Sequence, residues 1–496
     1  MKRINNKKQK INLFKNKFKK YLKKSIKVSK NLSFIILIFQ SLFISSILIT
    51  QPQGVNLYFM KLKRYALRSF DSFDIEDYGN YFKDLVFSFN PIKKDLQRLD
   101  LSLNFKNLQG LDCSRKYNHV SLINKEQLTI ENCGKYWFKG KLTQNNESFN
   151  VKLRSKGDRK IHHKDFNTMS FKADIKGKDR LNGMEEFSIQ TPIIRNYTIE
   201  LFAAELMRKE GIIAPRNNYV KFYINGEYKG IRHIEESFSR ELIEFNKRRY
   251  GPLFSLEESI SKNFDSAFFD LSDAKSWNNN ENQKYLAIQA RTVLEDSKTK
   301  KHFSKNYFDL DIWAKYFAII DAFRLWHGSL PKSVKFYLNP TTGLIEPAFF
   351  DGHIGAGPGL NNFNFFRLIN IPNAYDKECE FFCDPKYSSF YKKFFGTYDE
   401  PNHEFYTKYI KHLKRITNDT YYEKNIMPIW QDLRDERSSL YKELWRKDML
   451  SNPGLMPHIA PWKSLEKRII KIQKNLERSQ TLKPLIKVDE LNNKII

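Results

Sequence analysis

The chain has 496 residues, about three times the length of a typical domain, so one large or two ordinary domains are expected. Apolar residues make up 41%, with 41 Phe and 25 Tyr, which excludes a wholly disordered chain, and four cysteines exclude a fold built on a disulfide framework. With 85 Lys and Arg against 56 Asp and Glu, the formal net charge is +29, which suggests nucleic-acid binding until the position of the charge is considered.

The basic charge is concentrated at the N-terminus. The first 30 residues hold 13 Lys or Arg and no Asp or Glu, and taking these from +29 leaves +16 for the other 466 residues. An uncharged apolar stretch of 19 residues follows, Leu32–Thr50, and a membrane-spanning helix needs about 20. By the positive-inside rule we interpret residues 1–31 as a cytoplasmic arm, which also attracts anionic lipid, and residues 32–50 as a signal anchor.

A retained anchor has two alternatives. A cleaved signal peptide usually has a short charged region and a cleavage site of small residues, whereas here the charged region is long and no A-x-A pattern follows Thr50. A buried core helix is disfavoured because the stretch lacks amphipathic periodicity. The heavy use of Lys, Asn, Ile and Phe is typical of an AT-rich bacterial genome. We therefore expect a single-pass protein of the bacterial inner membrane, with its C-terminal domain periplasmic or extracellular and no nucleic-acid partner.

The cysteines form two local pairs, Cys113 with Cys133 and Cys379 with Cys383. In an exported domain each pair could form a disulfide. The sequence contains neither a C-x-x-C motif nor a matching His spacing that would indicate a metal cluster. The sequence is therefore compatible with disulfides and with free buried thiols.

The N-terminal half of the exported part is dominated by strands. We interpret residues 51–100 as a connecting segment and residues 101–256 as a strand-rich lobe. Its clearest unit is a hairpin over 219–234, in which two alternating runs flank Asn225-Gly226. One helix is expected over 197–210, because its apolar residues recur at i, i+3, i+4 and i+7 and Gly211 follows.

The C-terminal half is mostly helical. Residues 257–282 are polar and irregular and are interpreted as a linker, residues 283–480 as a helical lobe with one hairpin over 334–350, and residues 481–496 as a tail. The sequence therefore predicts an α+β, bilobal fold: a strand-rich N-lobe with one helix, then a helical C-lobe. Protein-kinase-like folds follow this plan and bind nucleotide in the cleft, but other α+β enzymes share it.

Two clusters in the strand-rich half are candidates for phosphate binding. In the first, a strand carrying Arg154 leads into a polar turn with Gly157 and Asp158, and the next strand carries Lys172. In a kinase a loop covers the phosphates and a strand lysine contacts them, although a single glycine makes this a weak signal and a plain basic hairpin is the alternative.

The second cluster is the helix after Arg195. Glu200 borders its apolar face while Glu205 faces water, so Glu200 is the better partner for a buried lysine, unless it serves only the helix start. Glu235 and Glu236 follow the end of the hairpin over 219–234. They could bind an adenine amino group, a cation or nothing.

A further cluster lies near the end of the second hairpin. The apolar run Ala348–Phe350 leads directly into Asp351 and a glycine-rich turn, the arrangement that a Mg²⁺–phosphate site requires, although an Asp can also simply start a turn. His327, at the end of a helix, could act as a base or orient a hydroxyl, whereas a lone His more often has a structural role.

In this order the clusters resemble the spore-coat protein H (CotH) kinase-like family, over about residues 150–360. The matching stretches are VKLRSKGD (151–158), SFKADI (170–175), RLNGMEEFSIQTPIIRNYTIELFAAELMRKEGIIAPR (180–216), VKFYINGEYKGIRHIEE (220–236) and FYLNPTTGLIEPAFFDG (336–352). The resemblance implies an atypical protein kinase-like fold behind the single membrane-spanning helix. It also implies ATP and Mg²⁺ as cofactors, and transfer of phosphate to Ser or Thr of a protein or to another surface acceptor.

The resemblance also implies roles for single residues. Lys172 matches the nucleotide lysine and Glu200 its helix partner. Arg154, Glu235 and Glu236 are counted with them as nucleotide-binding residues, and Asp351 matches the metal-binding aspartate.

The chain departs from the family pattern at two positions. His327 stands where family kinases carry the catalytic Asp, and Ser333 lies near the position of the metal-binding Asn. We therefore expect His327 to replace the base, with Lys172 and Asp351, and Ser333 to be the second metal ligand. The alternative is a pseudokinase-type scaffold of the cell envelope that binds a protein or polysaccharide partner.

Overall fold

The computed structural model divides the chain into two units, Met1–Phe73 and Asp74–Ile496, and all the residues that the structure describes belong to the second. These are residues 92, 94–124, 137–157, 160–257, 264–279, 281–352, 388–397, 400–447, 462–481, 488–489 and 494–495. The predicted arm and anchor, residues 1–50, lie outside them. Within the described ranges, no helix combines the length and the apolar composition that crossing a bilayer requires.

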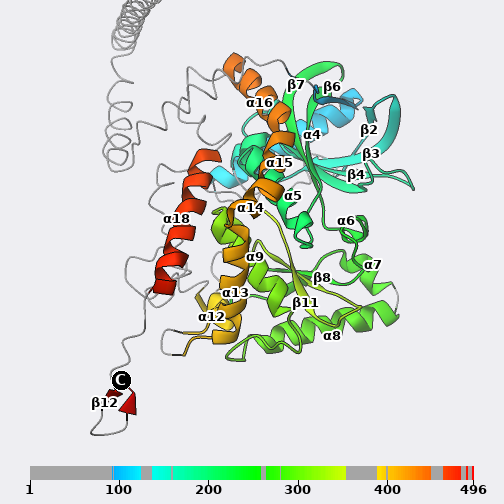
Figure 1. Ribbon diagram of the computed structural model, residues 1–496. Helices are drawn as coiled ribbons and strands as arrows, with labels where there is room; N and C mark the ends of the chain where they lie inside the picture. Colours follow the sequence, from blue (N-terminus) through cyan, green and yellow to red (C-terminus); the bar gives the residue numbers. More distant parts are fainter. Residues whose placement is uncertain are drawn as a thin grey trace, which may run out of the picture. The chain divides into compact units, whose positions relative to one another are not determined.

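Seven strands form a closed barrel in the order β1-β2-β3-β4-β5-β7-β6 (Figure 1). Neighbouring strands are antiparallel except β1 and β6, whose parallel pairing closes the barrel. Every second residue of a strand points inward, and these apolar side chains fill the interior. The strands are β1 (Gln97–Ser102), β2 (Phe138–Gln144), β3 (Glu147–Ser155), β4 (Phe171–Ile175), β5 (Glu186–Gln190), β6 (Asn217–Ile224) and β7 (Glu227–Glu236).

Two local predictions within this region are confirmed. β6 and β7 form the expected hairpin, and both turn residues, Asn225 and Gly226, have positive φ, as a two-residue hairpin turn requires. The expected helix is α5 (Thr198–Lys209), preceded by the short helix η3 (Pro192–Arg195). Outside the barrel, α4 (Phe105–Asn124) packs on β2 and β3, and its Cys113 is disulfide-bonded; the other three cysteines lie outside the described residues.

A second sheet, in the order β11-β10-β8-β9, belongs to the C-terminal half. Its strands are β8 (Leu253–Leu256), β9 (Phe269–Leu271), β10 (Lys335–Leu338) and β11 (Ile345–Ala348). The helices of this half are α6 (Arg240–Phe245), α7 (Ala274–Asn278), α8 (Glu281–Ser297), α9 (Leu310–Ala322), α10 (Trp326–Ser329), α12 (Ser388–Phe395), α13 (His403–Ile416), α14 (Asp419–Tyr421), α15 (Met427–Asp432), α16 (Arg434–Lys447) and α18 (Trp462–Thr481).

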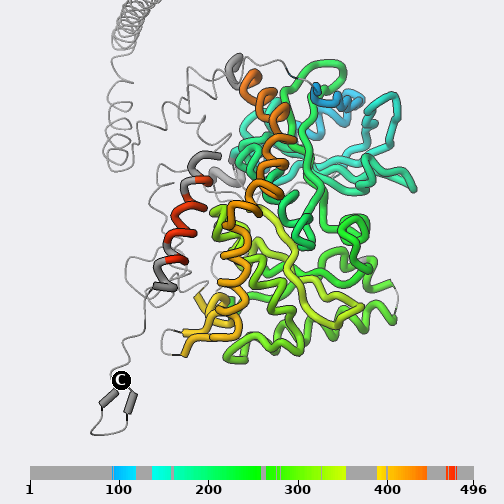
Figure 2. Tube along the Cα trace, viewed as in Figure 1, coloured from blue at the N-terminus to red at the C-terminus, as the bar shows by residue number. Residues whose placement is uncertain are grey.

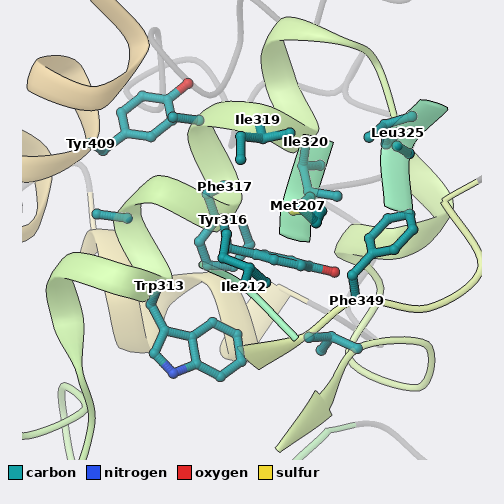
Figure 3. Close-up of a cluster of buried hydrophobic side chains, with 14 of the residues drawn as sticks. Met207, Ile212, Trp313, Tyr316, Phe317, Ile319, Ile320, Leu325, Phe349 and Tyr409 are labelled. Atoms are coloured by element: carbon teal, nitrogen blue, oxygen red, sulfur yellow. The ribbon is translucent and has the colours of Figure 1, made fainter. Parts of the chain in front are cut away.

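Helix α9 lies at the centre of the larger apolar core. Figure 3 shows its side chains, Trp313 and Tyr316 among them, in one cluster with Met207 of α5 and Phe349, which follows β11. The helices coloured orange in Figure 2 lead from this core to the barrel, where α16 packs against β7. Helix α5 therefore connects the barrel to the helical core, and it carries Glu200 between them.

The predicted fold, an α+β, bilobal, protein kinase-like architecture behind a membrane-spanning helix, is wrong. The strand-rich region is a closed seven-stranded barrel, and the helices of the described residues do not include one able to span a membrane. The physical reason is β1, most of which lies in the predicted connecting segment. It pairs with β6 in register, Gln97 with Val220, and such a long-range pairing leaves no local signal in the sequence.

Candidate functional site

Polar side chains line up across four strands on the outer face of the barrel. Arg154 of β3 is paired in register with Lys172 of β4, Lys172 with Ser188 of β5, and Ser188 with Glu235 of β7. Residues paired in this way project from the same face of a sheet, while their apolar neighbours fill the interior. The alternating pattern thus places three predicted nucleotide-binding residues, Arg154, Lys172 and Glu235, in one row.

The two lysines near this row have different partners. Lys172 donates to Ser237 Oγ and lies 2.6 Å from Glu186 Oε1, so its partners among the described residues do not include Glu200. Lys156, which directly follows β3, donates to Ser188 Oγ at 2.5 Å and lies 3.5 Å from Glu235 Oε2. Lys156 therefore reaches Glu235 at the buried end of the row, whereas the family resemblance gave the role of nucleotide-binding lysine to Lys172.

The loop that carries Lys156 is held against the barrel by its own residues. His163 Nε2 lies 2.7 Å from the carbonyl oxygen of Gly157. Gly157 has φ +108°, and a Cβ at this position would lie 2.1 Å from the ring of His162. Only glycine fits there, so the glycine of the predicted phosphate loop serves close packing; Asp158 lies outside the described residues.

Arg195 connects the barrel to the end of β11. Its guanidinium donates to both oxygens of Glu235, at 2.7 and 3.0 Å, and to Asp351 Oδ1 at 2.5 Å. It also lies over the ring of Phe350, 4.6 Å from the centroid. The planar fork of an arginine suits this simultaneous contact with two carboxylates. Neither Arg195 nor Lys156 was among the predicted site residues.

Asp351 and Glu200 lie side by side although they are far apart in the sequence. Asp351, which has φ +57°, is almost fully buried, and the backbone N–H of the next residue, Gly352, donates to Glu200 Oε2 at 2.9 Å. Glu200 is fully buried, and its other oxygen, Oε1, has no hydrogen-bond partner within the described part of the chain. A Cβ at Gly352 would lie 2.3 Å from the Phe349 ring, so this approach requires glycine.

His327 adjoins Asp351, and Ser333 adjoins His327. His327 Nδ1 lies 2.9 Å from Asp351 Oδ2 and 3.2 Å from the Asp351 carbonyl oxygen. Ser333 Oγ lies 3.3 Å from the same nitrogen. The structure thus brings the predicted base and both predicted metal ligands together, with the imidazole between Ser333 and Asp351.

The structure places one predicted residue elsewhere and another at the margin. Glu236 points away from the row and forms an ion pair with Arg216, which donates to both of its oxygens. Arg154 lies at the far end of the row, with its guanidinium 5.3 Å from the centre of the Trp137 ring. Glu236 is therefore not part of the buried cluster, and Arg154 is peripheral to it. The buried cluster consists of the side chains that lie around Arg195 and Asp351: Lys156, Arg195, Glu200, Glu235, His327, Ser333 and Asp351.

Burial and opposite charges shift the pKa values in this cluster. Burial alone would raise the pKa of Glu235, but Arg195 and Lys156 lower it to about 2. Burial lowers the pKa of Lys156 to about 8, against the effect of Glu235. Burial raises the pKa of Glu200 well above its ordinary value; Arg195 opposes this rise, and the neighbouring carboxylates of Glu235 and Asp351 add to it.

These residues fit a divalent cation bound together with phosphate. Mg²⁺ prefers carboxylate oxygens and is usually held by one or two carboxylates plus substrate phosphates and water. Glu200 and Asp351 supply two carboxyl groups, and Glu200 Oε1 is a buried oxygen with no hydrogen-bond partner among the residues that the structure describes. Groups of three or more His, Cys, Asp or Glu that could hold a metal ion are absent from the described residues, so phosphate and water would have to complete the coordination.

The sequence contains only a weak signal for Lys156 and Arg195, the two basic residues of the cluster that were not predicted. Lys152 and Arg154 point outward from β3, and Lys156 lies one step further in the same alternating pattern, just beyond the end of the strand. Extending this pattern past the strand would have predicted Lys156 as an outward-facing residue. Arg195 has no local signature: Asp351, one of its two partners, is 156 residues away.

Comparison with known proteins supports the family resemblance. Residues 138–352 match the family model described as CotH kinase protein. No curated protein matches the chain. The matched region begins at β2 and ends at Gly352, so it contains every residue of the cluster described above. The chain therefore carries a domain of the CotH kinase family over residues 138–352, as its sequence motifs predicted.

Proposed function

We propose that this protein is a CotH-like kinase that transfers phosphate from ATP to Ser or Thr of a protein, or to another acceptor at the cell surface. The family match supports a kinase-related function in general. The observation that supports the specific proposal is the buried cluster of acidic and basic side chains. In it Arg195 joins Asp351 to Glu235, Lys156 lies beside Glu235, and Glu200 accepts from the backbone of Gly352, next to Asp351.

Each residue of the cluster has a role in this proposal. Glu200 and Asp351 would hold Mg²⁺, which when bound neutralises the charge that develops on the transferred phosphoryl group. Lys156 and Arg195 supply donors for the phosphate oxygens. Because its pKa of about 8 lies above neutral pH, Lys156 stays mostly protonated.

His327 is the candidate base. Asp351 and Ser333 surround its Nδ1, which fixes the orientation of the ring. A positioned base of this kind typically contributes about 10²–10⁴-fold in rate.

A second candidate function is the non-catalytic scaffold, which would keep the domain to bind a protein or polysaccharide partner. The observation that favours it is that both oxygens of Asp351 already have partners, Arg195 and His327. A scaffold predicts no phosphate transfer, and this separates it from the kinase.

Phosphate transfer tests the proposal directly. The full chain is incubated with Mg²⁺ and γ-labelled ATP, and label is counted in the chain itself and in casein as a generic acceptor. We expect Asp351→Asn and Glu200→Gln each to lower the rate by about 10²-fold or more. Asp270→Asn, which changes an exposed carboxylate on β9, is the control and should have no effect. A wild-type chain that transfers no phosphate, or transfer that survives both changes, would overturn the kinase proposal.

A further inference from the structure

The guanidinium of Arg195 binds Asp351 at the place where the proposed function requires a divalent metal ion. Arg195 donates to Asp351 Oδ1 at 2.5 Å, and both groups are almost fully buried. The guanidinium and Mg²⁺ would use the same carboxylate. A carboxylate oxygen that already accepts a charged hydrogen bond is a poorer ligand for a second cation.

Glu235 has a second basic partner. Lys156 lies 3.5 Å from the carboxylate that Arg195 binds. If Arg195 moves, Glu235 keeps one positive charge beside it. The barrel side of the cluster can thus release the guanidinium without leaving a buried carboxylate entirely uncompensated.

The backbone after Arg195 is strained. Asn196 has φ +55° and ψ +38°, a left-handed conformation that Asn adopts readily at the end of a helix. The strain lies at Tyr197, which has φ +57° with ψ −133° and is not a glycine. Residues with a Cβ persist in such conformations only where surrounding contacts hold them, and they occur at ligand clamps and switch regions. Arg195, whose contacts are made directly before this pair, is one of the residues that hold the backbone there.

We propose that Arg195 is an internal counter-ion that exchanges partners when ligands bind. Without ligand it neutralises Asp351 and Glu235. When the divalent cation and the nucleotide phosphates bind, it leaves Asp351 Oδ1 to the cation and donates to a phosphate oxygen. This inference rests on the proposed function. Because the two ligands share one switch, each strengthens the binding of the other by the same factor.

The exchange is tested by Mn²⁺ binding to the full chain, measured as free Mn²⁺ by electron paramagnetic resonance, with and without a non-hydrolysable ATP analogue. In Arg195→Gln we expect nucleotide-free Mn²⁺ affinity to rise about tenfold or more, because the competing guanidinium is gone. Affinity for the analogue in the presence of Mn²⁺ should fall by a similar factor, because a phosphate donor is lost. The two changes have opposite signs, which a merely loosened structure would not produce.

The matched control is Arg216→Gln. It removes the same charge from the partner of Glu236, the residue next to Glu235 in β7, and it should change both affinities less than about twofold. A double variant, Arg195→Gln with Glu235→Gln, removes the buried ion pair without changing the net charge. It should show the same rise in nucleotide-free Mn²⁺ affinity, and it covers the case in which the single variant does not fold.

The outcomes separate the inference from the function on which it rests. If the wild-type chain binds neither Mn²⁺ nor the analogue, even when both are present, the proposed function fails and the inference fails with it. If the wild type binds both together but nucleotide-free Mn²⁺ affinity does not rise in the folded Arg195 variants, the counter-ion exchange is wrong and the proposed function stands.

Discussion

At the scale of single residues, the notable feature is a set of ionisable side chains with almost no contact with water. Glu200 and Glu235 are each at most 1% exposed. Buried ion pairs contribute little net stability, whereas the loss of one partner is costly because it leaves a charge uncompensated. A cluster of this kind is therefore better explained by ligand binding than by stability.

The two lysines near the cluster should differ in their effect on nucleotide binding. Because Lys156 lies beside Glu235 while Lys172 is engaged by Glu186, Lys156→Met should weaken Mg²⁺-dependent ATP binding about tenfold or more. Lys172→Met should weaken it less than about threefold. Fluorescence titration with a labelled nucleotide measures both, and Lys152→Met, on the outer face of the same strand as Arg154, is the control. The reverse order of effects would restore the role that the family resemblance gives to Lys172.

His233 should make the folded chain sensitive to acid. Burial lowers its pKa to about 3, below the usual 6.5, so the unfolded chain takes up the proton first as the pH falls. This contribution is complete only well above pH 6.5 and is lost as the pH drops, by about 2 kcal/mol between pH 6.5 and 4.5. Urea unfolding at several pH values should show a flatter pH dependence for His233→Gln than for the wild type. Parallel curves would show that His233 does not carry this effect; Glu235, with a pKa of about 2, contributes only at lower pH.

At the scale of elements, helix α5 connects Glu200, a proposed metal ligand, to the core. Its Phe202 is fully buried and stacks on Trp430 of α15 at 4.8 Å between centroids, with Phe323 edge-on at 5.0 Å. The same helix presents Glu200 to Gly352. The position of one carboxylate thus depends on aromatic packing two residues along the helix.

Truncation of Phe202 should therefore affect both stability and cation binding. Phe202→Ala removes a buried aromatic ring, which typically costs about 3–5 kcal/mol, and it should also weaken Mn²⁺ binding because α5 is less firmly held. Lys209→Ala, an exposed change on the same helix, should stay within about 0.5 kcal/mol of the wild type in denaturant unfolding. A loss of stability with unchanged Mn²⁺ affinity would mean that α5 does not position Glu200.

The elements also show which features the sequence could predict. The hairpin at Asn225-Gly226 and helix α5 follow from local patterns, and both are present. The closure of the barrel does not follow from local patterns. Alternation of polar and apolar residues in β1 shows which side chains point inward, but it does not show that β6 is the partner strand.

The same distinction holds for the candidate site. Asp351 was predicted from the strand-to-glycine pattern and Glu200 from its place on a helix face. Arg195 was missed because its contact with Asp351 depends on the meeting of two distant segments.

At the scale of the whole molecule, the net charge of +29 divides into two parts. Thirteen basic residues belong to the N-terminal 30, and the remaining +16 belongs to the rest of the chain, where it suits anionic ligands such as phosphates. We propose that the N-terminal arm stays in the cytoplasm and that the matched domain lies outside it. The disulfide at Cys113 supports this proposal, because such bonds persist in oxidising compartments.

The topology is tested with reporter fusions at the C-terminus in a bacterial host. Alkaline phosphatase, which needs an exported environment to form its disulfides, should be active, and a reporter that works only in the cytoplasm should be inactive. An inactive phosphatase with an active cytoplasmic reporter would place the domain in the cytoplasm.

The central claim is that the buried cluster of Glu200, Asp351, Lys156 and Arg195 binds ATP through a divalent cation. Isothermal titration calorimetry of the full chain with ATP, in Mg²⁺ and then in excess chelator, tests it most directly. We predict binding in Mg²⁺, loss of binding in the chelator, and an affinity at least about tenfold weaker in Asp351→Asn. Absence of binding in Mg²⁺, or ATP binding that is the same without Mg²⁺ and in Asp351→Asn, would contradict the claim.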